Sequence, residues 1–317
     1  MRFTVRSPAS SANLGPGFDA LGLALDLWSE VIVDTDGEPG AIMLDGAEAK
    51  LLAGRENLTL TAMRRLAEAH ERALPAFALT VRTGVPVARG LGSSATALVA
   101  GLVAANHLLG LDLTLEELYA VAWRMEGHGD NVGASLYGGA VLAMPTRHAI
   151  VQLSTGVDLG LVAVIFVPEI TGATWAARAA LPATIPHTDA TYTLATAAGL
   201  VLGLRTGDHG LIAAGMHDRL HEPYRARLFP HLEPLADAAR QAGALGACLS
   251  GAGPSVLALV EPAKAAAVAS TYTNAARRLG VGGDVLSLAP AVQGAHVAET
   301  AVPASVQKAK VATAAGL

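Results

Sequence analysis

Strand patterns and helix patterns are mixed in both halves of this chain without a regular rhythm, and this limits the possible folds more than any other feature. Alternating or β-branched stretches predict strands at 3–6, 21–33, 77–85, 140–144, 161–167, 247–250 and 256–260. Helical spacing predicts helices at 58–72, 93–109, 112–126, 188–204, 208–221, 232–243 and 262–279. Strict strand–helix alternation would indicate a doubly wound sheet, so the mixture favours an α+β protein.

The length of 317 residues suits two ordinary domains. The pattern of elements changes near residues 147–158, so we expect an N-terminal domain at 1–152 and a C-terminal domain at 153–317. Within the latter, residues 302–317 have weak helical character. No fixed-period repeat is present in the sequence.

Composition excludes several classes of function. The chain is 52% hydrophobic and 15% charged, which indicates a packed globular protein. The net charge is −5 and no basic tract occurs, which disfavours nucleic acid or an anionic membrane as the main partner. The longest apolar run, 159–167, is too short for a membrane span of about 20 residues. With no signal-peptide pattern and a single cysteine, Cys248, we expect a cytoplasmic protein.

A glycine-rich segment leads directly into the predicted helix 93–109. Such a turn presents unpaired N–H groups and the positive end of the helix dipole, which together favour an anion, usually a phosphate. The residues expected to hold it are Pro86, Val87, Ala88, Arg89, Gly90, Leu91, Gly92, Ser93, Ser94, Ala95 and Thr96. An ordinary helix N-terminus with serine caps would have the same sequence pattern. A dinucleotide-binding fingerprint ending at Ala95 is disfavoured, because Asp112 opens a second helix and no strand follows until residue 140.

Two further segments combine glycine with polar residues. The first, residues 8–22, carries Asn13 and Asp19 among small residues and is predicted to be a long loop over 7–17. The second, residues 246–255, places a glycine turn between two predicted strands. Taken singly, the first would be a surface turn and the second a plain hairpin.

Together, the three segments resemble the three motifs of the GHMP kinases, in the same order and over residues 8–260. The first motif, N-L-G-P-G-F-D, resembles that of the homoserine kinases in particular, and residues 174–182 and 222–230 support this group. The resemblance implies a two-domain α+β fold. Its N-terminal half would be similar to ribosomal S5 domain 2 and its C-terminal half ferredoxin-like. It also implies phosphoryl transfer from ATP with Mg²⁺ to the hydroxyl of L-homoserine, a step toward threonine.

Roles for individual residues follow from the same resemblance. Ser94 and Glu126 would bind Mg²⁺, and Asn57 would lie near the adenine, although a plain helix N-cap explains Asn57 equally well. Asp130 would position the substrate first and act as a base second. The residues that would surround the substrate are Asn13, Asp19, His128, Asp130, Asn131, Arg178 and Arg225. The family usually has proline between the histidine and the aspartate. Gly129 stands there in this chain, which makes that loop less rigid.

Other interpretations of the sequence stay open. Another GHMP kinase, acting on a mevalonate-type or sugar-type substrate, and a non-catalytic nucleotide-binding protein on the same scaffold both fit the motifs. A nicotinamide-dependent dehydrogenase fits less well, because the required strand is missing. His217 and His221 would share one face of the predicted helix 208–221, but no third zinc ligand is evident. The partner we expect is a small molecule, and a homodimer is compatible with the resemblance.

Overall fold

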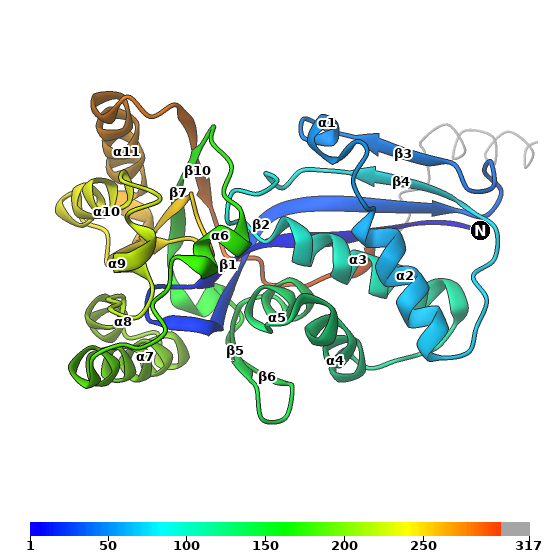
Figure 1. Ribbon diagram of the computed structural model, residues 1–317, viewed down its shortest axis with the longest axis horizontal. Helices are drawn as coiled ribbons and strands as arrows, with labels where there is room; N and C mark the ends of the chain where they lie inside the picture. Colours follow the sequence, from blue (N-terminus) through cyan, green and yellow to red (C-terminus); the bar gives the residue numbers. More distant parts are fainter. Residues whose placement is uncertain (299–317) are drawn as a thin grey trace, which may run out of the picture.

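The computed structural model describes residues 1–298 and contains two β-sheets joined by two long strands (Figure 1). The weak helical character expected at 302–317, and with it the end of the second predicted domain, lie outside the described residues. The α+β prediction is confirmed, because helices and largely antiparallel strands occur in both parts.

The first sheet has seven strands within the described residues, and its central path runs β11-β1-β2-β4-β3. Strand β5 pairs with β2 and with β6. Within the described residues, β3 and β4 form the only parallel pair of this sheet. The strands are β1 (Arg2–Asn13), β2 (Gly17–Asp34), β3 (Ile42–Asp45), β4 (Ala78–Arg82), β5 (Ala140–Met144), β6 (Ala149–Ser154) and β11 (His296–Ala298). The long β1–β2 pair carries the chain from this sheet toward the second one (Figure 1).

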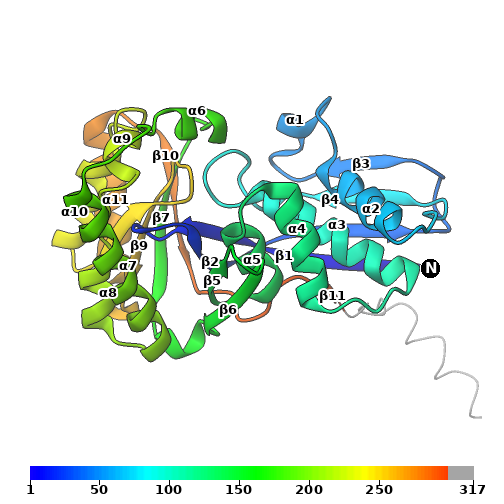
Figure 2. The ribbon, with the colours of Figure 1, turned by 60° about the horizontal axis from the view of Figure 1, so that its bottom comes forward.

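A group of helices covers the first sheet and buries its apolar side chains (Figure 2). These helices are α2 (Leu58–Ala69), α3 (Ser93–Leu109), α4 (Leu115–Glu126) and α5 (Asp130–Tyr137), whereas the short helix α1 (Ala49–Leu52), beside β3, has no buried residue. Helix α3 has buried residues all along its length, mostly alanine, valine and leucine. Because these side chains are small, the helix approaches its neighbours closely: a Cβ atom on Gly101 would collide with the backbone of Thr59 on α2.

The second sheet has four antiparallel strands in the order β10-β7-β9-β8. They are β7 (Val162–Pro168), β8 (Gly246–Leu249), β9 (Val256–Val260) and β10 (Gly283–Leu288). One face packs against α10 (Leu232–Gln241) and α11 (Ala265–Leu279). The other face packs against α7 (His187–Thr206), α8 (His209–Gly215) and the far end of β1–β2. The remaining elements are α6 (Thr174–Ala179), α9 (Glu222–Arg225) and two short 3₁₀ turns, Val157–Leu159 and Pro262–Lys264.

The loop predicted at 7–17 is wrong for most of its length. Residues 7–13 continue β1 and pair with β2, with register shifts after Pro8 and after Ala12. Irregularities of this kind accommodate a proline within a strand. Only the short connection from Leu14 to Pro16 remains a turn, so cross-strand pairing outweighed the local proline and glycine signals.

The helix cap predicted at Asn57 is confirmed, and one predicted helix is too long. Asn57 accepts a hydrogen bond from the Leu60 N–H, and Thr114 forms a capping box with Glu117. The helix predicted at 208–221 ends at Gly215 as α8. Beyond it, the Asp218 carboxylate accepts N–H bonds from three residues that follow it and turns the chain into the short helix α9.

The domain division at residues 152 and 153 stays a prediction. The first sheet takes β1 to β6 and, from the other end of the described chain, β11.

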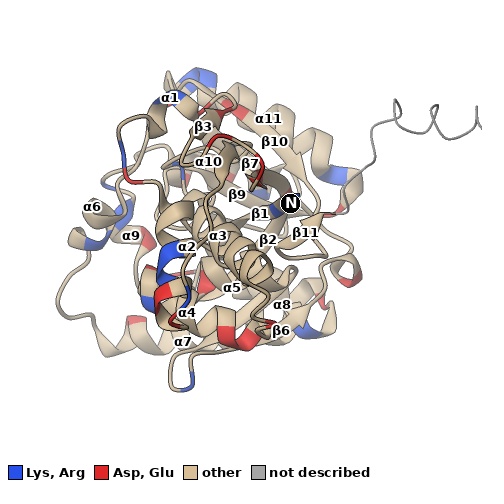
Figure 3. Cartoon of the chain, turned by 90° about the vertical axis from the view of Figure 1, so that its right-hand side faces the viewer, with Lys and Arg blue, Asp and Glu red and all other residues tan. Residues whose placement is uncertain are grey.

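In the view of Figure 3, acidic and basic residues lie interspersed along the elements. None of the helices within residues 1–298 has the length and apolarity that crossing a membrane requires.

Candidate active site

The three glycine-containing segments meet through hydrogen bonds between parts of the chain that are far apart in sequence. The Ser10 N–H donates to the Leu91 carbonyl at 3.1 Å, and Ser250 Oγ donates to the Gly90 carbonyl at 2.7 Å. Asn13 Nδ2 donates to the Gly251 carbonyl at 2.8 Å. All three segments line one cavity of about 570 Å³ between the two sheets. A volume of this size is typical of a small-molecule site.

Glycine is required at two positions where α3 begins. Gly90 and Gly92 have φ of +77° and +68°, a region that strains other residues. A Cβ on Gly90 would collide with the Ser250 carbonyl, and one on Gly92 with Ser10 Oγ. These glycines therefore allow the three segments to approach one another and bring the start of α3 to the cavity, where its first N–H groups have no helical partners.

The structure separates the residues predicted to hold an anion into two sets. Those that line the cavity are Val87, Ala88, Gly90, Gly92, Ser93, Ser94 and Thr96. Pro86, Arg89, Leu91 and Ala95 are not among the lining residues, and Leu91 and Ala95 are fully buried in the core. The Arg89 guanidinium bonds to Glu48 at 2.8 Å and to the Pro168 carbonyl at 3.0 Å. Its side chain thus braces the loop from outside the cavity.

Ser94 and Glu126 form a pair of oxygen groups at one wall of the cavity. Ser94 stands in the first turn of α3, and Glu126 is the last residue of α4. The two helix ends meet, as expected for antiparallel helices joined by a short turn, and Ser94 Oγ donates to Glu126 Oε1 at 2.6 Å. A hydroxyl and a carboxylate are hard oxygen ligands, the type that Mg²⁺ prefers.

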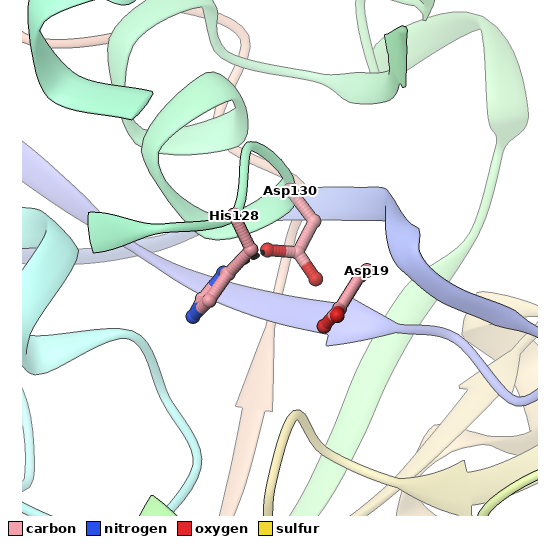
Figure 4. A group of neighbouring side chains, drawn as sticks. All are labelled: Asp19, His128 and Asp130. Carbon is pink, nitrogen blue, oxygen red and sulfur yellow. Dashed lines mark hydrogen bonds and ion pairs between the residues drawn. The ribbon is translucent and has the colours of Figure 1, made fainter. Parts of the chain in front are cut away.

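Three titratable side chains gather deeper in the same cavity. Asp130, at the start of α5, is 1% exposed, and its Oδ1 accepts from His128 Nδ1 at 2.7 Å and from the Asn131 N–H at 2.8 Å. Figure 4 shows this pair with Asp19 lying nearby on β2. Ligand-type atoms of Asp19, His128 and Asp130 all lie within 4.8 Å of one another. Burial lowers the pKa of His128, but the hydrogen bond and charge of Asp130 outweigh it and raise that pKa above its usual value.

The first segment holds Asn13 and Asp19 in left-handed conformations, with φ of +71° and +55°. Such conformations cost free energy outside glycine and gather at functional sites. The Asp19 N–H donates to Asn13 Oδ1 at 3.0 Å, which stabilises the turn between them. The turn brings both side chains to the cavity wall.

The two predicted substrate-binding arginines also reach the cavity, in contrasting environments. Arg178 on α6 makes a two-pronged ion pair with Asp19, at 3.0 and 2.9 Å, and its pKa is raised mainly by that hydrogen-bonded partner. Arg225 on α9 is 2% exposed and donates to the Ala177 and Gly251 carbonyls. Burial, and then the charge of Arg178, lowers the pKa of Arg225.

Comparison with known proteins matches two family models to the chain, one to an N-terminal and one to a C-terminal segment. The family model of the GHMP kinases N terminal domain matches residues 57–139, and that of the GHMP kinases C terminal matches residues 200–277. A homoserine kinase from Synechococcus sp. (strain CC9605) is 43% identical over 302 residues, which cover 93% of this chain and 95% of that protein. A homoserine kinase from Moorella thermoacetica is 39% identical, over 92% of this chain and 99% of that protein.

The chain belongs to the homoserine kinase family of GHMP kinases. It is therefore a kinase, and both the family and the fold class predicted from the motifs are confirmed. The crystal structure of homoserine kinase from Cytophaga hutchinsonii superimposes with a TM-score of 0.85 at 31% identity, over 94% of this chain and 97% of that one. The crystal structure of L. major mevalonate kinase in complex with R-mevalonate shares the fold, with a TM-score of 0.66 at 17% identity.

An apolar end of the cavity was not predicted from the sequence. It is lined by Val31, Ile42, Leu44, Leu52, Leu58 and Val81, with Asn57 beside them. These residues come from three strands and two helices, and no local sequence pattern marks them as neighbours. Asn57 caps α2 and lines the cavity at the same time, so its two interpretations are compatible.

His217 and His221, for which the sequence favoured no zinc site, do not share one face of a helix. His217 and His221 both follow the end of α8 and lie outside a helix. His221 is buried, with its Nε2 bonded to the Gly15 carbonyl at 2.8 Å and its Nδ1 facing Arg225 Nη1 at 3.3 Å. The polar partners of His221 are therefore Gly15 and Arg225, and the latter lines the cavity.

Proposed function

We propose that this kinase transfers the γ-phosphoryl group of ATP to the hydroxyl of L-homoserine, giving O-phospho-L-homoserine in threonine biosynthesis. The names of its relatives support the substrate. The observation in the structure that carries the proposal is the two-pronged ion pair between Arg178 and Asp19 beside the buried Arg225. This arrangement offers opposite charges at a short, fixed separation on the cavity wall.

A zwitterionic amino acid complements that arrangement. Its carboxylate would accept paired hydrogen bonds from Arg178 or Arg225, and its ammonium group would donate to Asp19 and to Asn13. The substrate carboxylate would thus take the place of Asp19 beside an arginine, and the substrate ammonium would take the place of Arg178 beside Asp19. Mevalonate or a sugar has no ammonium group and would leave the Asp19 carboxylate without its partner, which costs binding free energy. The charges therefore favour an amino acid over the other substrates of the superfamily.

The nucleotide would occupy the other end of the cavity. Its base fits the apolar wall near Asn57, and its phosphates fit the start of α3 at Gly90 to Ser94, where N–H groups are unpaired. Ser94 and Glu126 would hold Mg²⁺, since their oxygens lie 2.6 Å apart at the same wall. When bound, the ion supplies charge neutralisation at the phosphates. The loop and the two helix ends keep the reacting groups in place.

Asp130 is placed to orient the reacting hydroxyl. Its buried carboxylate is held by His128 Nδ1 and by the Asn131 N–H, which fixes its direction in the cavity. Phosphoryl transfer depends mostly on positioning and charge stabilisation, so we assign Asp130 to positioning first and to proton acceptance second.

The test is an ADP-release assay with Mg-ATP and, in parallel, L-homoserine, mevalonate, galactose and L-serine. We expect turnover with L-homoserine alone, and a loss of at least about a hundredfold in kcat for Glu126→Ala, because a metal ligand contributes several kcal/mol to the transition state. Glu116→Ala, on the exposed part of the same helix, is the matched control. Turnover with mevalonate or galactose instead would refute L-homoserine as the substrate.

The homodimer and the cytoplasmic location stay predictions. Gel filtration would test the first and cell fractionation the second.

A further inference from the structure

His221 is a buried histidine outside the set of residues assigned above to substrate, nucleotide or metal. Its side chain is 0% exposed, and both ring nitrogens have protein partners. Nε2 faces the Gly15 carbonyl, which can only accept, so Nε2 carries the hydrogen. Nδ1 faces Arg225 Nη1, which can only donate, so Nδ1 accepts. The ring is therefore neutral, with one defined tautomer.

The groups around the ring agree with this assignment. Burial lowers the pKa of His221, and the positive charge of Arg225 lowers it further. The Asp218 carboxylate, which lies 3.7 Å from Nε2 and accepts three backbone N–H groups, raises the pKa of His221, but burial outweighs its charge. The Phe18 ring covers the imidazole with ring centroids 5.1 Å apart.

Arg225 is oriented by the same network. Its Nε donates to the Ala177 carbonyl, and its Nη1 is shared between the Gly251 carbonyl and His221 Nδ1. Its Nη2 makes no hydrogen bond to any protein group within residues 1–298, and the side chain lines the cavity. The guanidinium is thus fastened along one edge, which leaves Nη2 for a ligand.

We propose that His221 is a positioning residue that holds Arg225 through Nδ1 and the turn before Asp19 through Nε2. One rigid ring then sets the separation between a group for the substrate carboxylate and the turn that presents Asp19 to the substrate ammonium. The inference rests on the proposed function, in which Arg225 and Asp19 bind those two groups of an amino acid. It adds a determinant of specificity that touches no substrate atom.

Two near-isosteric variants separate this role from simple packing. In His221→Asn, the amide oxygen can replace Nδ1 as the acceptor for Arg225, whereas in His221→Gln the amide nitrogen can replace Nε2 as the donor to Gly15. Both variants lose the ring and its contact with Phe18. We expect His221→Gln to raise KM for L-homoserine on the order of tenfold, the effect of a lost hydrogen bond to a charged group, with KM for ATP unchanged. His221→Asn loses the link to Gly15 but should raise KM for L-homoserine less, because the turn before Asp19 is also held by the bond from the Asp19 N–H to Asn13 Oδ1.

Equal values of KM for L-homoserine in the two variants would overturn the proposal, whether both match the parent or both rise together. The parent protein gives a second test that needs no variant to fold. Long-range ¹⁵N–¹H NMR of the full chain should show His221 with a protonated Nε2, an unprotonated Nδ1 and no titration around its usual pKa of about 6.5. A protonated Nδ1 would refute the link to Arg225.

The inference and the proposed function fail in different ways. If the parent does not phosphorylate L-homoserine, the proposed function is wrong and the inference falls with it. If the parent is active but Arg225→Gln leaves KM for L-homoserine unchanged, the function stands, and the role of Arg225 and the inference built on it are wrong. If the parent is active and Arg225→Gln raises KM, but His221→Gln does not, only the inference is wrong. The three variants therefore belong in one series of assays.

Discussion

The two ends of the cavity are built from different kinds of chemical group. Where α3 begins, the wall is made of backbone groups and glycines, and the charged residue of that loop, Arg89, turns away to Glu48. Between α6 and α9, the wall is made of charged side chains, with Arg178, Arg225 and Asp19 in contact with one another or with backbone carbonyls. Backbone N–H groups fit any phosphate, whereas charges at fixed separations distinguish one small molecule from another.

This difference predicts opposite sensitivities to mutation. The end at α3 depends on the space that glycine leaves, so an added methyl group should cause more damage than the loss of a charge. The end at α6 and α9 depends on charge and tolerates little change in it. Its most crowded glycines, Gly17 and Gly253, face side chains and not a backbone carbonyl as Gly90 does.

The largest effect is expected for Gly90→Ala. The new Cβ would collide with the fixed Ser250 carbonyl, and the φ of +77° strains any side chain. The loop must shift to relieve the collision, and a displacement of about 1 Å can cost about a hundredfold in rate. We therefore expect kcat/KM for ATP to fall by about a hundredfold or more, measured in the ADP-release assay.

Gly110→Ala is the matched control for this prediction. Gly110 ends the same helix at a φ of +59°, but a Cβ there would meet no atom within 4 Å. It should lower the midpoint of thermal unfolding slightly and leave kcat/KM unchanged. If the two variants behave alike, backbone strain and not crowding governs this end of the cavity.

A smaller and more selective effect is expected for Asp19→Asn. The substitution keeps the shape of the side chain but removes the charge that pairs with Arg178 and, under the proposed function, with the substrate ammonium. Hydrogen bonds to charged groups are worth about 1.5–3 kcal/mol, so KM for L-homoserine should rise roughly tenfold to a hundredfold. KM for ATP should stay unchanged.

Asp237→Asn serves as the control, because Asp237 makes an exposed ion pair with Arg240 that is distant from the cavity lining. It should change neither KM. A rise in KM for ATP in the Asp19 variant would show that the two ends of the cavity are coupled, which the contrast between them does not predict.

The contrast also explains what the sequence could reveal about each end. The glycine motif indicated a backbone site only together with the other two segments, because an ordinary helix start would have the same residues, whereas the meeting of Ser94 with Glu126 follows from two antiparallel helices. The outward turn of Arg89 could not be predicted, since its partner Glu48 lies 41 residues away in the chain. Cross-strand pairing likewise converted the expected loop at 7–17 into strand.

At the other end, the identities of the charged residues came from resemblance, and their network came only from the structure. Arg225 taken alone would be assigned to the surface, yet it is 2% exposed. Its burial depends on carbonyl groups contributed by Ala177 and Gly251, which no local pattern connects. The sequence therefore predicted which residues form this end but not how their charges are compensated.

The smallest predicted effect concerns the carboxyl group behind the charged end. Burial, helped by the charge of Asp218, raises the pKa of Glu222 to about 8, although its carboxylate accepts the Leu249 N–H and faces Arg240 and Arg225, which all lower it. Between the unfolded pKa of about 4.3 and this value, the folded state binds one more proton than the unfolded state, so this group lowers stability as pH rises. Glu222→Gln keeps the acceptor oxygen and removes the titration. In urea unfolding, the variant should gain stability relative to the parent from about pH 5 to about pH 9, whereas Glu233→Gln, at an exposed site on α10, should not. A parallel pH dependence in the Glu222 variant and the parent would show that this carboxyl group stays ionised, with its charge already compensated by the arginines of the substrate end.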